Sequence, residues 1–359
     1  MALRIHQRFV NTISSRLQWL PKRAILPLSA VIVVIPAITA LAFSYGPMVS
    51  VQPESGTLSG GAITVADANA SSGQAVRFGN SSDCAAGTPA AGGWTLPDLC
   101  GWPTASSTGP RYECATTLTG RIQTTSDGQV FDNVCINGGL DINHNNVVVR
   151  DVAIMGSGLY PLDIGPDSPT CPTNLTIEYT EVDMSNINSN ALPIYQRCGG
   201  DHSFDHIKVH NCARGMQLIG GGVSVTDSYI YCHRTWEGDH RTAISSHGGT
   251  GFTVTHNTFM CVGDNCSSSV NMYSDYAPMT DYLFQDNLVA GGTICVRGGE
   301  THVYATQTSS IRVINNRFST HYNPLCGVYQ PFAQFDENAP GNVQSGNVYH
   351  ESGDTIPSG

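Results

Sequence analysis

Charged residues are scarce in this chain, and basic residues are scarcer still. Only 13% of the 359 residues are charged, which is low for a soluble domain. Five of the 17 basic residues precede residue 24, so the rest of the chain holds 12 Lys and Arg against 28 Asp and Glu, a formal charge of −16. A nucleic-acid-binding protein would show a basic patch or stripe. The sequence has none, so we exclude a nucleic-acid partner.

The sequence also lacks two patterns that would indicate other folds and chemistries. No Cys-x-x-Cys pair occurs among its 12 cysteines, which argues against zinc ribbons and thioredoxin-like redox sites. The central region lacks a clean helical period of 3.6 residues. β-branched residues, glycines and Asn/Asp turns dominate instead, and they favour an all-β fold.

A long apolar segment is present near the N-terminus. Residues 24–43 form a run of 20 uncharged residues, enough at ~1.5 Å per residue to span a bilayer core of ~30 Å. The basic arm of residues 1–23 precedes it and should stay in the cytoplasm. We expect a transmembrane helix that anchors the protein, or a signal segment that is cleaved, since the Ala-Leu-Ala at 40–42 resembles a cleavage site. The body is expected outside the cytoplasm in both cases.

All 12 cysteines follow this apolar segment. An even number of cysteines confined to an exported region is typical of disulfides. Cys261 and Cys266 bracket a four-residue loop and form the pair that is most readily predicted. Cys135 and Cys212 lie in strand-like runs, where buried unpaired thiols are an alternative.

A short phrase recurs along the body of the chain: an apolar residue, any residue, a turn-forming residue, two further residues and usually an apolar residue. Its instances begin at residues 131, 149, 177, 209, 225, 254, 284 and 313. The third position is occupied by Asn133, Asp151, Tyr179, Asn211, Asp227, His256, Asp286 and Asn315. The spacings of 18, 28, 32, 16, 29, 30 and 29 residues indicate a long-period repeat.

A stack of coils explains this repeat. One coil cannot bury its apolar face alone, whereas coils stacked ~4.8 Å apart form a continuous core. Asn and Asp suit a corner because they tolerate left-handed backbone, and stacked corner amides can bond one another along the axis. We predict a right-handed, single-stranded parallel β-helix. The alternative is an antiparallel β-sandwich, for which Asn137-Gly138 is a hairpin signal.

At these phrases the chain resembles the pectate-lyase-like superfamily of right-handed parallel β-helix proteins. The segments GQVFDNVCINGGLDINHNNVVVRDVAI and GDHRTAISSHGGTGFTVTHNTF are similar to rungs of a bacterial exported group of mostly unassigned function. The resemblance runs from about residue 100 to residue 318 and implies the fold rather than an activity. That group often has His, one residue and then Asp in its central loop, whereas this chain has Asp239 before His240.

These patterns define the expected domain organisation. Residues 44–83 form a spacer that resembles a fragment of a carbohydrate-binding module and holds one hairpin. The β-helix domain spans residues 84–320, and the cysteine-containing stretch 81–114 caps its N-terminal end. Residues 321–359 form a C-terminal cap or tail.

Function on a solenoid tends to lie in the loops that its coils eject. Coils of 28 to 32 residues must eject part of their length, and we place the loops near 155–174, 184–203, 231–250, 261–280 and 290–309. The stretch 231–249 is the richest in acid, base and aromatic side chains. We predict catalytic roles for His240, Arg241, Asp239, Glu237 and Asp275, and substrate binding by Trp236, Arg234, Tyr273 and Arg297. His233 and His247 are interpreted as structural, and no metal ligands are assigned.

Two mechanisms fit this set. A lyase would neutralise a uronate with Ca²⁺ held by carboxylates and remove the C5 proton with His240 or an arginine. A glycoside hydrolase would need two carboxylates, ~6.5–9.5 Å apart in an inverting enzyme. The candidates are Glu237, Asp239, Asp264 and Asp275.

We therefore predict an exported monomer at the cell surface that acts on or binds polysaccharide, as a lyase or a glycoside hydrolase. The alternative is a non-catalytic surface adhesin or structural solenoid, which would bind glycans without releasing products. The expected partners are a polysaccharide or cell-surface glycan and, through residues 24–43, the membrane.

Overall fold

The computed structural model describes residues 101–168, 170–187, 190–235, 240–299 and 303–358, together with two short strands nearer the N-terminus. The predicted arm and apolar segment, residues 1–43, lie outside the described residues. No helix in the described part of the chain is long and apolar enough to cross a membrane. The membrane anchor therefore stays a prediction.

The two N-terminal strands, β1 (Ile63–Ala66) and β2 (Gln74–Arg77), pair antiparallel with each other. They form the one hairpin that was expected in the spacer of residues 44–83.

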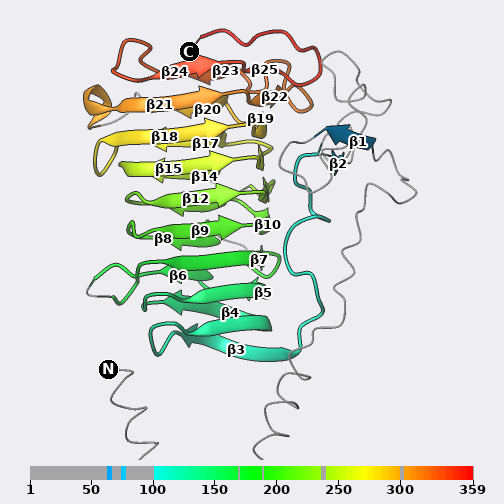
Figure 1. The fold of residues 1–359 in the computed structure, drawn as a ribbon, viewed down its shortest axis with the longest axis vertical. Coiled ribbons are helices and arrows are strands. Elements are labelled where there is room, and N and C mark those ends of the chain that lie inside the picture. The colour runs from blue at the N-terminus through cyan, green and yellow to red at the C-terminus, as the bar shows by residue number, and fades with distance from the viewer. Residues whose placement is uncertain are drawn as a thin grey trace, which may run out of the picture. The chain divides into compact units, whose positions relative to one another are not determined.

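The body of the chain is a stack of coils in which three ladders of parallel strands form (Figure 1). Ladder 1 contains β9 (His202–Asp205), β12 (Val223–Thr226), β15 (Gly249–Thr255), β18 (Met279–Gln285), β21 (Ser309–Ile314) and β24 (Val343–Ser345). Ladder 2 contains β10 (Lys208–Cys212), β13 (Tyr229–Cys232), β16 (Thr258–Cys261), β19 (Leu288–Gly291), β22 (Arg317–Ser319) and β25 (Val348–Tyr349). Ladder 3 contains β6 (Leu162–Ile164), β8 (Ile194–Gln196), β11 (Met216–Leu218), β14 (Arg241–His247), β17 (Cys266–Tyr273), β20 (Ile294–Gly298) and β23 (Gln330–Ala333).

The first coils use longer strands that extend through more than one ladder. These strands are β3 (Thr116–Gln123), β4 (Val130–Ile142), β5 (Val148–Gly156) and β7 (Leu175–Asp183). β4 pairs with β5 and then with β6, and β7 pairs with both β9 and β10.

The pairing decides between the two predicted fold classes. All pairings among the strands β3 to β25 are parallel, which excludes the antiparallel sandwich and fits a parallel β-helix. The one helix in the described ranges is the 3₁₀ turn η4 (Ala305–Gln307). The fold is therefore all-β, as predicted, while the right-handed sense of the coils stays a prediction.

Ladder 3 is the main difference from the sequence-based expectation. The stretches that were predicted as ejected loops contain β6, β8, β14, β17 and β20 at their centres. They are therefore the third side of each coil, flanked by shorter loops such as 165–174. The coils also continue beyond the predicted boundary at residue 320, because β23, β24 and β25 extend all three ladders.

A left-handed residue forms the corner between ladders 1 and 2 in successive coils. All eight third-position residues of the phrase have positive φ, between 46° and 56°, as their Asn and Asp content predicted. One register was wrong, because the corner between β9 and β10 is His206, with φ 51°, rather than Asn211. That phrase begins at Phe204, so the spacings of 32 and 16 residues become 27 and 21.

Buried asparagines form a hydrogen-bonded stack beside this corner. Its members are Asn257, Asn287, Asn316 and Asn347, each at most 1% exposed. The side-chain Nδ2 and the backbone N–H of each asparagine donate to the Oδ1 atom of the asparagine in the next coil, at 2.8–3.0 Å. The predicted amide stack is thus present, but it lies one residue after the left-handed position, where the side chain is buried within the coil.

Five disulfides connect the described cysteines. They join Cys114 to Cys135, Cys171 to Cys198, Cys212 to Cys232, Cys261 to Cys266 and Cys295 to Cys326. The predicted pairing of Cys261 with Cys266 is confirmed, and unpaired thiols at Cys135 and Cys212 are excluded. Disulfides persist in oxidising compartments, so they indicate an extracytoplasmic environment.

Residues 101–115, which we call the strap, run along the side of the stack to β3, as the cyan segment of Figure 1 shows. The Trp102 indole Nε1 donates to the carbonyl of Asp286 at 2.8 Å. The Arg111 guanidinium donates to both carboxylate oxygens of Asp151 at 2.9 and 2.6 Å. The described part of the stretch that was expected to cap the N-terminal end therefore lies against the corners of many coils instead.

The asparagine stack predicts a large effect of one substitution. Asn287→Ala removes four side-chain hydrogen bonds, to Asn257, Asn316 and Val254, and leaves buried donors and acceptors unpaired. Such groups cost about 1–3 kcal/mol each, so we expect the free energy of unfolding to fall by roughly 3 kcal/mol in urea denaturation. The control is Asn338→Ala at an exposed turn, which should change stability by less than about 0.5 kcal/mol. An equal effect of the two variants would contradict a stabilising role of the stack.

Candidate functional site

The outer face of ladder 3 carries a row of polar side chains. Alternate residues of each strand point into the core, such as Ile194 and Ile244, which are both fully buried. The strand register places the outward residues in one row: Asp163, Tyr195, Gln217, Ser245, Asn271 and Arg297. His247 and Tyr273 are also paired in register, two residues further along β14 and β17. Stacking thus brings together residues that are far apart in the sequence.

An arginine held between a carboxylate and two aromatic rings forms one part of this face. Arg197 donates to both oxygens of the buried Asp163 carboxylate, at 2.6 and 2.8 Å. Its guanidinium carbon lies 4.5 Å from the ring centre of Tyr195 and 4.9 Å from that of Tyr160. Arg121 also pairs with Asp163, at 3.5 Å. These contacts fix a cation and two ring faces, and aromatic faces of this kind are suited to contact sugars.

A histidine bonded to a carboxylate and a hydroxyl forms the second part. His247 Nδ1 lies 2.6 Å from Asp275 Oδ2, and His247 Nε2 lies 3.1 Å from Ser245 Oγ. The His247 side chain is 13% exposed and that of Asp275 is 23% exposed. A carboxylate on one ring nitrogen fixes the orientation and tautomer of an imidazole, so that the other nitrogen can exchange a proton.

Two tyrosines surround this histidine. The ring centres of Tyr273 and Tyr276 lie 5.6 and 5.7 Å from that of His247, and Tyr276 is 61% exposed. Burial raises the pKa of the Tyr273 phenol and of the Tyr195 phenol, so both stay protonated at neutral pH. The row of outward residues leads from Tyr195, beside Arg197, through Gln217 to Ser245, beside His247. The histidine part and the arginine part therefore lie on the same face of ladder 3.

The predicted site residues divide between the two ends of β14. Asp275, Tyr273 and Arg297 lie on the face just described, where Arg297 donates to Gln334 Oε1 at 2.7 Å. His240 precedes β14, is exposed, and lies 3.3 Å from Ser267 Oγ. His247 follows His240 by seven steps of extended chain, a distance of about 23 Å. They therefore cannot share one active site.

Two of the predicted residues are engaged with backbone carbonyls. Arg241 is fully buried, and its guanidinium donates to the carbonyls of Arg234 and Val262. Arg234 is half-buried and donates to the carbonyls of Met184 and Ile187 at 2.8 and 2.5 Å. Both arginines thus hold turns of the chain together. Trp236, Glu237 and Asp239 lie outside the described residues.

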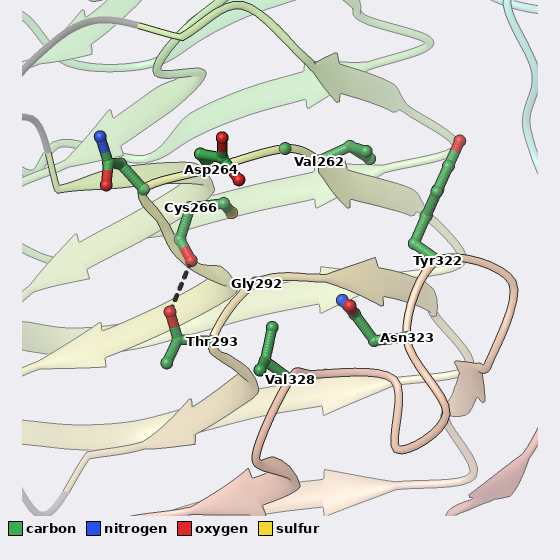
Figure 2. A pocket seen from close by; sticks show the side chains of 10 residues that line it. Val262, Asp264, Cys266, Gly292, Thr293, Tyr322, Asn323 and Val328 are labelled. Atoms are coloured by element: carbon green, nitrogen blue, oxygen red, sulfur yellow. Dashed lines mark hydrogen bonds between the residues drawn. The ribbon is translucent and has the colours of Figure 1, made fainter.

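A hollow of about 800 Å³ lies between the turn after β16 and the loop after β22 (Figure 2). Asp264 lines it on one side, and Tyr322 and Asn323 line it on the other. The Thr293 hydroxyl donates to the Cys266 carbonyl at 2.9 Å within it. Among its described lining residues Asp264 is the one carboxylate, so these residues alone do not supply the pair that a glycoside hydrolase needs.

Among the described residues, the ladder 3 face holds no group of three possible ligands for the Ca²⁺ that a lyase would use. Within the described ranges, one group of three possible metal ligands lies close together, and it is at the corner between ladders 1 and 2. Asp141 and Asp163 are bonded to Arg121 or Arg197, and such pairing competes with a cation. A Ca²⁺ ion at the site stays a prediction.

Sequence reasoning missed Ser245, Tyr195, Arg197 and Asp163, and it interpreted His247 as structural. These residues lie in or next to strands of ladder 3 that were assigned to loops. The usable signal was the alternation of apolar and polar residues in segments such as Leu162–Ile164 and Ile194–Gln196, each of which is three residues long. Such short segments become informative only when the register of the coils is known.

Comparison with known proteins carries no argument about the fold or the function of this chain. No protein-family model matches the chain, and no curated protein matches it. Among solved structures, the A-module of the mannuronan C-5 epimerase AlgE4 of Azotobacter vinelandii is similar, with 13% sequence identity and a TM-score of 0.30. The match covers 68% of this chain and 91% of that module. A similarity of this degree says nothing of the activity.

Away from the ladder 3 face, the outer surface of ladder 2 carries a charged cluster around Glu181 of β7. The carboxylate Oε1 of Glu181 lies 2.6 Å from His210 Nε2 and 2.9 Å from Lys208 Nζ. The hydrogen bond from His210, together with Lys208, lowers the pKa of Glu181 to about 2 although burial opposes this. The ion pairs join adjacent coils, because β7 pairs with β10.

This group predicts a loss of stability in acid. Because the pKa of Glu181 in the folded state is about 2 and lies below the unfolded value of ~4.3, its contribution is complete above that value and is lost as the pH falls to about 2. We expect Glu181→Gln to lower the free energy of unfolding by on the order of 2 kcal/mol at pH 7, and by almost nothing at pH 2. Glu178→Gln, which removes the same charge from the same strand, should retain the acid-dependent loss of the unmodified protein. Parallel pH profiles for Glu181→Gln and the unmodified protein would refute this role.

Proposed function

We propose that this protein acts on an acidic polysaccharide that lies across the outer face of ladder 3, with His247 as the proton-transferring group. The observation that carries the proposal is the Asp275–His247 pair at 2.6 Å, flanked by Tyr273 and Tyr276. The disulfides support an exported location, and residues 24–43 are the proposed anchor or signal.

The reaction that this site supports best is β-elimination at a uronate. His247 Nε2 would take the proton from C5 of the sugar while Asp275 holds the Nδ1–H. The electron pair of the C5–H bond forms the C4–C5 double bond, and the bond from C4 to the glycosidic oxygen breaks. The Tyr273 phenol, whose pKa is raised by burial, is the proposed donor of a proton to the leaving oxygen.

Arginines on the same face support an anionic substrate. Arg297, which bonds the neutral amide of Gln334, presents positive charge on a chain whose body is strongly acidic, whereas the charge of Arg197 is balanced by Asp163. A uronate carboxylate near these guanidinium groups would be partly neutralised, and this makes removal of the adjacent C5 proton easier. Proton transfer is therefore assigned to His247 rather than to His240 or Arg241, and Tyr195 and Arg197 are added to the proposed binding residues.

The test is a product screen of the purified full chain on a panel of polyuronates, with and without Ca²⁺. We expect unsaturated uronide products, measured by their ultraviolet absorbance. His247→Gln and Asp275→Asn should lower kcat by about 100-fold or more. His144→Gln is the control, because His144 bonds Thr124 at another part of the solenoid, and it should retain full activity.

The other outcomes of this screen are informative. Elimination that survives His247→Gln would overturn the assignment of the base. Reducing ends without unsaturated products would support a glycoside hydrolase instead. Retained glycan binding without any product would support the non-catalytic adhesin.

A second candidate function rests on one further contact. Ser245 Oγ lies 3.1 Å from His247 Nε2 while Asp275 holds Nδ1, which is the Ser–His–Asp arrangement of acyl-transfer enzymes. Such a site would remove ester groups from a polysaccharide: Ser245 attacks the acyl carbonyl, the sugar hydroxyl leaves with the proton from His247, and water then releases the acid.

Ser245→Ala separates the two candidates. An esterase would lose acetate release from an acetylated polysaccharide by at least about 1,000-fold, and a lyase would keep its elimination rate within a few-fold. If Ser245→Ala leaves acetate release unchanged, the esterase candidate fails. Acetate release is measured together with the unsaturated products in the same reactions.

A further inference from the structure

Three potential metal ligands meet at the corner between ladders 1 and 2. Asp205, His206 and Asp227 each offer one ligand atom, and these atoms all lie within 4.8 Å of one another. Asp205 is the last residue of β9, His206 follows it, and Asp227 follows β12 in the next coil. The cluster is separate from the ladder 3 face and takes no part in the proposed function.

The imidazole of His206 is prepared for a further bond. Its Nδ1 atom is buried and makes no hydrogen bond, although Asp205 Oδ1 lies only 3.0 Å away. The ring is held in place by stacking on Tyr179, with ring centres 4.5 Å apart and an interplanar angle of 24°. A buried ring nitrogen without a hydrogen bond is costly, and a metal ion between it and the carboxylates would satisfy it.

The carboxylates are oriented by neighbours that leave oxygens available. Asp227 Oδ1 bonds His256 Nδ1 at 2.5 Å, and Asp205 Oδ1 accepts from the Thr226 hydroxyl at 3.0 Å. Hydrogen bonds to ligating carboxylates are the usual supporting contacts of metal sites, because they fix the ligand before the ion arrives.

The strap and two members of the cluster line one cavity. Gly101, Trp102, Thr104 and Ser106 line a cavity of about 280 Å³ together with His206, Asp227 and His256. The hydroxyl groups of the strap and water can complete the coordination that three protein ligands leave open. The site therefore has both a donor set and a partly enclosed volume.

We propose that Asp205, His206 and Asp227 bind one divalent transition-metal ion of the Zn²⁺ class, which cross-links two coils beneath the strap. The imidazole favours such an ion over Ca²⁺ or Mg²⁺, because those ions take oxygen ligands. Two carboxylates provide the charge that a divalent cation needs. The role of the ion is structural, since the cluster lies on a different side of the coil from the proposed catalytic residues.

The test is calorimetric titration of Zn²⁺ into the full chain after chelator treatment. We expect one equivalent to bind, and we expect His206→Asn and Asp227→Asn each to weaken binding by more than about 10-fold. Asparagine is chosen because both positions have positive φ, 51° and 47°, and because Asn133 and Asn315 occupy equivalent corners. The control is Asp286→Asn, which removes a carboxylate from another corner and should bind Zn²⁺ like the unmodified protein.

Two further measurements keep the proposal open to refutation if one variant folds poorly. Co²⁺ bound to the unmodified protein should give ligand-field absorption, and this absorption should be absent from Asp205→Asn. Zn²⁺ should raise the Tm of the unmodified protein and of Asp286→Asn, but not the Tm of the variants that lack a ligand. Circular dichroism checks that each variant is folded. The site would be overturned if the unmodified protein showed no saturable Zn²⁺ binding. It would also be overturned if folded His206→Asn and Asp227→Asn bound Zn²⁺ as tightly as the unmodified protein.

Discussion

In-register stacking of successive coils is the constraint on which the rest of this structure depends. Each strand pairs in parallel with its counterpart in the next coil, so a residue type that suits one position tends to suit the position above it. The asparagine stack from Asn257 to Asn347 shows the consequence at its strongest, because each amide satisfies the next. A buried polar column of this kind specifies the register, since a shift by one residue would leave every amide unpaired.

The candidate site follows from the same constraint applied to the outer surface. Alternation along β14 puts Ser245 and His247 on one side of the strand, and stacking of β17 brings Tyr273 and Asp275 next to them. Strand β14 holds Ser245 and His247, and Asp275 follows two residues after the end of β17, where its hydrogen bond to His247 fixes the pair; proton transfer benefits from such fixed geometry. The same face continues to Arg197 and its two tyrosine rings, as the proposed binding of a chain of sugars requires.

The sequence predicted the parts of the fold that depend on one residue in each coil. A corner needs a left-handed residue, and Asn133, Asp227 and Asn315 display that need directly. The strands of ladder 3 need no left-handed residue. No particular residue type therefore marks them in the sequence, and these short strands were assigned to loops. The pairing of His247 with Asp275, 28 residues apart, could not be predicted for a related reason. It depends on the exact length of each loop, and the misplaced phrase at residue 209 shows how easily one coil is counted wrongly.

The strap has a consequence for how the molecule unfolds. In a solenoid each coil contacts only its neighbours, so coils can fray one at a time from either end. The strap departs from this nearest-neighbour rule, because Arg111 contacts the coil of Asp151, Gly109 the coil of His206 and Trp102 the coil of Asp286. Loss of an inner coil would therefore disturb contacts several coils away. The strap couples the array into one cooperative unit, so that a linear repeat unfolds more nearly as a single globular domain does.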